Sequence, residues 1–133
     1  MAEDNVMEAK EQRAFVYVVK CRDDSLYTGI TKDLKKRMRE HHDKGGKGAK
    51  YTRSHGIVSI VMVWEALSYS SAARLEYGIK HLARKEKLKL IAFPEEGVKE
   101  LLPRLSGENY VPRKEFVMNI DKFLERDSKF IQS

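Results

Sequence analysis

The sequence predicts a small α/β (α+β) fold in which a three-stranded, mainly antiparallel sheet is flanked by helices. Two short segments rich in β-branched and aromatic residues, 15–19 and 25–30, are separated only by a turn, which is the pattern of a β-hairpin. A nearly continuous apolar segment, 57–67, indicates a third strand that is covered on both faces. Helical spacing of apolar residues follows the second and third of these segments.

Length and composition predict one domain with short appendages. The chain has 133 residues, of which 41% are hydrophobic, and this is enough for one core. Its apolar runs are far shorter than the roughly 20 residues of a membrane span, so we expect a soluble protein. Residues 1–13 mix acids and bases and are predicted to form a flexible leader. With Cys21 as the single cysteine, no internal disulfide can form, and we expect an intracellular, cytoplasmic or nucleoid-associated location.

The hairpin is followed by a predicted helix over residues 33–42. Thr31 and Asp33 offer side-chain oxygens that can cap its first turn. Leu34, Met38 and His41 recur at helical spacing and form its expected apolar stripe. Residues 43–56 contain four glycines, which interrupt regular structure, so we expect a mobile loop there.

Two further helices are predicted after the third strand. Ser70 and Ser71 can cap the first, which is expected to end near residues 83–85. The second is expected over residues 85–93 and stops at Pro94, whose ring cannot join the preceding turn. The predicted buried positions are Ala72, Leu75, Ile79 and Leu82 in the first helix, and Leu88, Ile91 and Ala92 in the second.

Residues 94–133 are predicted to be a helical C-terminal extension of a compact domain formed by residues 14–93. Residues 95–102 are compatible with a short helix, and residues 103–112 contain turn formers. Three alternatives remain open for the extension: it folds back on the domain, pairs with a second copy, or binds another partner. The apolar residues Phe116, Ile120, Phe123 and Leu124 repeat like one face of a helix.

Positive charge is concentrated in the middle of the chain. The formal net charge is +6, and residues 14–93 contain 17 Lys and Arg against 8 Asp and Glu. Residues 32–53 alone hold nine bases and three acids. Such a density suits a phosphate backbone, although charge alone fits a solvated surface about equally well.

The order and spacing of several residues resemble the GIY-YIG nuclease family. The tripeptide 15–17 (Phe-Val-Tyr) resembles the first family signature, and 27–29 (Tyr-Thr-Gly) resembles the second. The tyrosines and the last glycine are kept, and the other three positions differ. Tyr27 follows Tyr17 by ten positions, and Arg37 follows Tyr27 by ten more, as in the family arrangement.

The resemblance extends to about residues 14–93 and is closest to the small stand-alone members of the family. Residues 46–53 are similar to the Gly-Lys-rich segment of those members. The resemblance implies a metal-dependent endonuclease that hydrolyses phosphodiester bonds in nucleic acid, with DNA favoured over RNA. Mg²⁺ is the implied cofactor, and Mn²⁺ is an alternative. A module that binds DNA or RNA without cutting it is the leading alternative, and an interaction protein that works through its tail is the third.

The resemblance also implies the metal ligand, which is Glu76 on the second predicted helix. One carboxylate, with waters and a substrate phosphate, is a plausible magnesium site. From helix spacing alone, an exposed i,i+4 ion pair between Glu76 and Lys80 is the better explanation. The resemblance reverses this order.

The remaining catalytic roles are assigned by resemblance to Arg37, His41 and the two tyrosines. Arg37 would place a fixed cation on the scissile phosphate. His41 would donate to the phosphate or position water, but it also fits as the end of an apolar stripe. Tyr17 or Tyr27 would act as base or orient the attacking water, with Tyr17 preferred as base. Because an ordinary phenol has a pKa near 10, a nearby cation is expected to lower it.

A geometric condition follows for the hairpin. Both phenols lie on one face only if the numbers of paired positions add up to an even value, as they do when Tyr17 lies opposite Tyr27. We therefore expect an odd number of residues in the connection, such as 21–23 or 20–24. Gly29 is interpreted as a structural residue, approached by substrate or by the first helix, with a bulge as the alternative.

A second set of residues is expected to bind nucleic acid through backbone phosphates, with one tyrosine able to stack on an unpaired base. Each of the residues at 47–53 fits a solvated loop about as well. Leu88 stands near the place where some larger family members have an asparagine, so no residue is assigned to leaving-group stabilisation. The set consists of Lys36, Lys47, Lys50, Tyr51, Thr52, Arg53 and Lys80.

Overall fold

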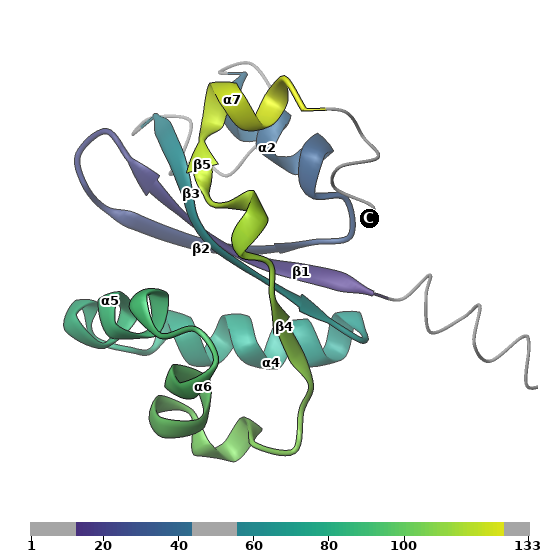
Figure 1. Ribbon diagram of the computed structural model, residues 1–133, viewed down its shortest axis with the longest axis vertical. Coiled ribbons are helices and arrows are strands. Elements are labelled where there is room, and N and C mark those ends of the chain that lie inside the picture. The colour runs from purple at the N-terminus through teal and green to yellow at the C-terminus, as the bar shows by residue number, and fades with distance from the viewer. Residues whose placement is uncertain (1–12, 44–55, 127–133) are drawn as a thin grey trace, which may run out of the picture.

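The computed structural model describes residues 13–43 and 56–126, which form one antiparallel sheet with helices on both faces (Figure 1). Figure 1 shows α4, α5 and α6 on one side of the sheet and α2 and α7 on the other. The elements are β1 (Ala14–Cys21), β2 (Leu26–Thr31), α2 (Leu34–His42), β3 (Ile57–Ala66), α4 (Tyr69–Lys80), α5 (Arg84–Ala92), α6 (Glu96–Leu101), the 3₁₀ turn η1 (Pro103–Leu105), β4 (Tyr110–Pro112), the 3₁₀ turn η2 (Lys114–Phe116), β5 (Met118–Asn119) and α7 (Ile120–Leu124).

The sheet has five strands in the described part of the chain, so the prediction of three was too low. Its order is β2-β1-β3-β4, and β5 pairs with β3 further along the same strand. The two additional strands, β4 and β5, pair antiparallel with β3. Strands of three and two residues are too short to show an alternating pattern, which is why sequence periodicity does not reveal them. The predicted hairpin and the third strand are both present.

The register of the hairpin places both tyrosines on one face. Tyr17 pairs with Gly29, and Val19 pairs with Tyr27, so the two tyrosines are diagonal neighbours rather than directly opposite. Lys20 pairs with Leu26, which leaves residues 21–25 between the last paired positions. This connection has an odd number of residues, so the parity condition is met; it has the length of the longer expected connection, 20–24, and is shifted by one position.

Helix α2 follows the prediction closely. The Asp33 side chain caps it by accepting a hydrogen bond from the Lys36 backbone N–H at 3.1 Å. Leu34, Met38 and His41 are its buried residues, as their spacing predicts. This phase leaves Arg37 on the border between the buried and exposed faces, where its guanidinium can reach both protein and solvent.

Helix α4 begins two residues earlier than predicted. Its cap is Ser68 rather than Ser70 or Ser71, because the Ser68 side chain accepts a hydrogen bond from the Ser71 backbone N–H at 3.0 Å. The helix ends at Lys80, before Leu82. The Glu86 side chain accepts a hydrogen bond from the Ala83 N–H at 2.9 Å, so the chain already enters the next helix there. Ala72, Leu75 and Ile79 are buried as predicted, and Leu82 is partly buried.

The predicted inner face of α5 was wrong. Its buried residue is Leu90, whereas Leu88 is 48% exposed and Ala92 is exposed. Leu90 packs against Gly97 of α6, where an added Cβ would lie 2.9 Å from a Leu90 methyl carbon. The third predicted residue, Ile91, is partly buried. The packing of α6 on α5 therefore decides which side of α5 is covered.

The two faces of the sheet have separate apolar clusters. On the α4 side, Val16, Val18 and Trp64 pack with Leu75 and Ile79. On the α2 side, the cluster includes Tyr17, Val19, Leu34, Met38, Val63, Phe116, Ile120 and Phe123. Side chains on β1 alternate between the two clusters, as expected for a central strand with helices on both faces.

The C-terminal residues 94–126 fold back on the sheet, which is one of the three alternatives that the sequence left open. The predicted last helix is divided in the structure: Phe116 ends η2, and α7 begins at Ile120. Arg113 is buried and pairs with Glu65 on β3, and its guanidinium lies 4.5 Å from the ring centroid of Phe116. In the described ranges, no helix is both long and apolar enough to cross a membrane.

Candidate active site

The predicted site residues come together at the edge strand β2. Tyr17 and Tyr27 lie on the face covered by α2, and α4 contacts the hairpin from the other face. Tyr17 is directly opposite Gly29 across the hairpin. A Cβ added to Gly29 would lie less than 3.0 Å from three atoms of the Tyr17 ring. Gly29 therefore makes room for the Tyr17 phenol. The predicted explanations, close approach of the first helix or a bulge, are not what the structure shows at this position.

The hydroxyl group of Tyr17 is held between two side chains of α2. It lies 2.8 Å from Nε2 of His41, and it accepts a hydrogen bond from Nε of Arg37 at 3.2 Å. Tyr17 is 0% exposed and His41 is 2% exposed, so both groups are shielded from bulk water. Since Arg37 and His41 are one helical turn apart, α2 presents both to the same phenol.

Burial controls the protonation of this pair. Burial raises the pKa of Tyr17 well above its usual value, and the hydrogen bond from Arg37 lowers it by less. The expectation that a nearby cation gives a net lowering is therefore not met at Tyr17. Burial, with a smaller contribution from the charge of Arg37, lowers the pKa of His41 to about 4. At neutral pH both groups are uncharged, and the Tyr17 hydroxyl can donate its hydrogen to the unprotonated Nε2.

Tyr27 completes an aromatic cluster with these two residues. The Tyr17 and Tyr27 ring centroids are 6.5 Å apart, and each is 5.6 Å from the His41 ring. Unlike Tyr17, Tyr27 is partly exposed. Nζ of Lys80 lies 6.0 Å from the centroid of the Tyr27 ring, so α4 covers part of this phenol from the opposite face of the sheet.

Glu76 lies beside this cluster. Its Oε2 atom is 3.3 Å from Nζ of Lys80, so the i,i+4 pair expected from helix spacing is present. The same lysine reaches Tyr27, and the negative charge of Glu76 helps to raise the pKa of Tyr17. The Glu76 side chain is 20% exposed. The carboxylate is thus both an ion-pair partner and a neighbour of the tyrosines.

The donor set suits a hard cation bound through few protein ligands. In the part of the chain that the structure describes, no three His, Cys, Asp or Glu residues are grouped as metal ligands. Mg²⁺ commonly binds through one or two carboxylates and keeps several waters. The partly exposed Glu76 carboxylate therefore fits a magnesium ion that is completed by waters and a substrate phosphate.

Sequence reasoning missed one residue of the cluster, Glu40. Its Oε1 atom accepts a hydrogen bond from the Arg37 guanidinium at 3.1 Å, which fixes the arginine while its Nε contacts Tyr17. The i,i+3 spacing of Arg37 and Glu40 on a predicted helix was a usable signal for this pair.

The predicted nucleic-acid contacts are only partly described. Lys80 lies at the site, and Lys36 is exposed on α2 next to Arg37. The other predicted contacts lie outside the described residues; they are Lys47, Lys50, Tyr51, Thr52 and Arg53.

The chain is similar in sequence to a known family of domains and to several bacterial proteins. A model of the GIY-YIG catalytic domain matches residues 13–89. The UPF0213 protein OB0043 of Oceanobacillus iheyensis is 46% identical over 86 residues, which are 65% of this chain and 98% of that protein. The UPF0213 protein FN1575 of Fusobacterium nucleatum is 41% identical over 87 residues, which are 65% of this chain and 85% of that protein. The UPF0213 protein BH0048 from Bacillus halodurans, which has a solution NMR structure, is 40% identical in sequence. The alignment covers 71% of this chain and 97% of that chain, with a TM-score of 0.42.

Proposed function

The chain belongs to the GIY-YIG family of nuclease domains, and on this premise we propose that it is a divalent-metal-dependent endonuclease that hydrolyses phosphodiester bonds, in DNA rather than RNA. The stretch that matches the family includes Tyr17, Tyr27, Arg37, His41 and Glu76. The observation that carries the proposal is that side chains from both faces of the sheet meet at β2.

In this proposal, Glu76 holds the metal ion. A divalent ion held there, Mg²⁺ or Mn²⁺, would supply positive charge for the phosphate and for activation of water. Glu76 is the acidic residue of α4 that lies at the tyrosine cluster, and its partial exposure leaves it accessible to water and substrate. Lys80 partly neutralises this carboxylate through their ion pair.

Arg37 is proposed to bind the scissile phosphate. Its guanidinium is fixed by Glu40 on one side and by the Tyr17 hydroxyl on the other. The planar guanidinium suits two phosphate oxygens, and a cation held in place stabilises the charge that develops during hydrolysis. The electrostatic role therefore depends on Tyr17 as a positioning residue.

The two tyrosines are proposed to have different roles. Tyr17 is fully buried, and its raised pKa keeps it protonated at neutral pH, so it is poorly suited to accept a proton from water. We therefore assign Tyr17 to holding Arg37 and His41. Tyr27 is partly exposed beside Lys80 and Glu76, and its hydroxyl is assigned to orienting the attacking water.

The test is a cleavage assay with Glu76→Ala on labelled single-stranded, duplex and flapped DNA, and on RNA, with magnesium or with chelator. We expect the unmodified protein to cut only with metal, and the variant to cut at least about a hundredfold more slowly, since a catalytic metal supplies several kcal/mol. Binding in chelator should change less than about twofold. Glu100→Ala is the matched control, because Glu100 forms an ion pair with Lys89 at 3.3 Å on the surface.

Two outcomes contradict the proposal. If the unmodified protein binds nucleic acid but never cuts it, the chain is a binding module without turnover. Equal cleavage by Glu76→Ala and Glu100→Ala would remove Glu76 from the site.

A further inference from the structure

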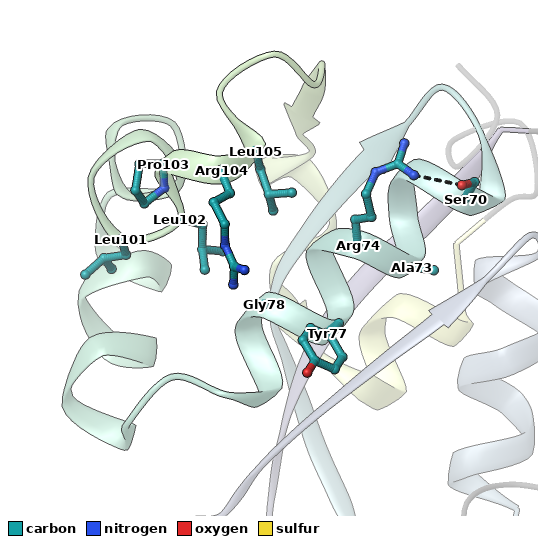
Figure 2. A pocket seen from close by; sticks show the side chains of 10 residues that line it. All are labelled: Ser70, Ala73, Arg74, Tyr77, Gly78, Leu101, Leu102, Pro103, Arg104 and Leu105. Atoms are coloured by element: carbon teal, nitrogen blue, oxygen red, sulfur yellow. Dashed lines mark hydrogen bonds between the residues drawn. The ribbon is translucent and has the colours of Figure 1, made fainter.

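A groove runs between α4 and the C-terminal segment 101–105, on the side of α4 that faces away from the sheet (Figure 2). Its volume is about 530 Å³, which is within the usual range for small-molecule sites. The α4 wall includes Arg74, Tyr77 and Gly78, and the other wall includes Leu102 and Arg104.

The groove is a feature that the family stretch alone does not form. The family model ends at residue 89, so it includes α4 but not residues 101–105. The OB0043 relative is matched over 98% of its length, yet that match takes in only 65% of this chain. The C-terminal segment therefore adds the second wall. Gly78 permits the close packing, because an added Cβ would lie 3.0 Å from a Leu102 methyl carbon.

One side of the groove presents an aromatic surface. Tyr77 is 61% exposed, so much of its ring is open to solvent. Its ring stacks on His81, with centroids 4.1 Å apart and planes tilted by 35°. Nδ1 of His81 donates a hydrogen bond to the Tyr77 carbonyl at 2.8 Å, which fixes the imidazole under the phenol. The pair is a preorganised platform for a planar ligand.

Positive charge borders the same space. Arg74 bonds to Ser70 at 2.9 Å and to Glu108 at 3.0 Å, so it is held in place and partly neutralised. Arg104 is exposed and has no ion-pair partner among the described residues. Figure 2 shows its side chain reaching from η1 toward α4, beside Leu102. An aromatic platform, apolar leucines and an arginine together suit a ligand that is planar and anionic, as a nucleotide is.

The groove and the proposed metal ligand share helix α4. Tyr77 directly follows Glu76, so their side chains leave the helix about 100° apart. We propose, on the basis of the nuclease function proposed above, that the groove binds one unpaired nucleotide of the substrate strand beside the bond that is cut. The base stacks on Tyr77, and Arg104 contacts the adjoining phosphate. The preferred substrate therefore has a single-stranded segment next to the cleavage site.

The experiment measures binding and cleavage separately. Binding of fluorescent single-stranded and duplex oligonucleotides of equal length is measured by anisotropy in chelator, where no metal is available. Tyr77→Ala should weaken single-strand binding about tenfold, because stacking on one base is lost. Arg104→Ala should weaken single-strand binding. It should also reduce the slope of log affinity against log salt concentration by about one. Duplex affinity should change less than twofold, and Tyr77→Phe should restore single-strand binding.

Two control variants match the groove substitutions. Phe93→Ala removes an aromatic ring that is 58% exposed outside the groove, and Lys99→Ala removes an exposed positive charge from α6. Both should bind single strands like the unmodified protein. Thermal unfolding of all variants confirms that they are folded.

The outcomes distinguish this inference from the proposed function. If the unmodified protein cuts DNA and Tyr77→Ala binds and cuts single strands normally, the groove inference is overturned and the nuclease proposal stands. If single-strand binding depends on Tyr77 but no substrate is cut, the nuclease proposal fails and the nucleotide site is supported. Equal losses of affinity for single-stranded and duplex oligonucleotides overturn the inference. Self-association that depends on Tyr77, without any effect on nucleic-acid binding, also overturns it.

Discussion

Among the described residues, Nε2 of His41 is the acceptor placed for the phenolic hydrogen of Tyr17, because Arg37 can only donate to the phenolic oxygen. This arrangement requires a neutral imidazole. Burial and the charge of Arg37 both disfavour the protonated ring and hold its pKa near 4. Protonation of His41 would place a second positive charge beside Arg37 and end the hydrogen bond from Tyr17. The state of this one ring therefore connects the pH of the solution to the geometry of Arg37.

The low pKa of His41 predicts a loss of stability in acid. In the unfolded chain an ordinary histidine has a pKa near 6.5, so between about pH 6.5 and 4 the unfolded state binds more protons. Stability then falls as the pH falls through this window, by roughly 3 kcal/mol at pH 4. The free energy of unfolding, measured by denaturant titration at several pH values, should show this loss in the unmodified protein and not in His41→Gln. The same pH dependence in both proteins would contradict a buried neutral His41.

Residue patterns predicted some of these features well and others not at all. The spacing of Leu34, Met38 and His41 predicted the buried face of α2, because residues three or four positions apart lie on the same side of a helix. The reason for Gly29 was not predictable, because it depends on a ring twelve positions earlier that lies across the hairpin. The direction of the Tyr17 pKa was also missed, since burial on this side depends on packing by residues after 110.

At the scale of elements, the C-terminal segment is part of the same core as the site. Phe116 and Phe123 are 0% exposed and belong to the cluster that contains Tyr17. The link continues at the surface, where the His42 Nε2 atom lies 2.9 Å from a carboxylate oxygen of Asp121. The segment thus supports α2, which carries Arg37 and His41. Deleting everything after Phe93, the obvious test of a separate tail, would also remove this support.

A single substitution tests the support more cleanly than the deletion. Phe123→Ala leaves a cavity in the cluster and should destabilise the protein by about 3–5 kcal/mol. Val117→Ala is the control, because Val117 is 42% exposed and its loss should cost less than about 0.5 kcal/mol. Chemical denaturation of both variants measures the difference. Similar stabilities for the two variants would show that the C-terminal segment is not packed on the sheet in solution.

The sequence did not predict how this segment is used. Its apolar residues indicated a helix, and the structure uses them in a 3₁₀ turn, a two-residue strand and a short helix. The strands form because β3 offers unpaired backbone groups on the side away from β1, and nearby chain can satisfy them. Such pairing depends on the assembled sheet and leaves little trace in local periodicity.

At the scale of the whole molecule, the sheet brings together residues that are far apart in the sequence. Arg37 and His41 come from the helix on one face, and Glu76 and Lys80 come from a helix on the other. They meet at β2 because it is the edge strand, where both helices can reach the same phenols. A site divided between two faces also explains why the spacing of the motifs along the chain does not by itself show which side chains touch.

The most direct test of this convergence is a double-mutant cycle between Arg37 and Glu76, measured as single-turnover cleavage rates with magnesium. Residues that act as a unit on one reaction give non-additive losses. We expect Arg37→Ala and Glu76→Ala each to reduce the rate at least about a hundredfold, and the double variant to be no more than about tenfold slower than the worse single variant. Losses that multiply in full, or a single variant that cuts at the normal rate, would contradict one shared active site at the edge of the sheet.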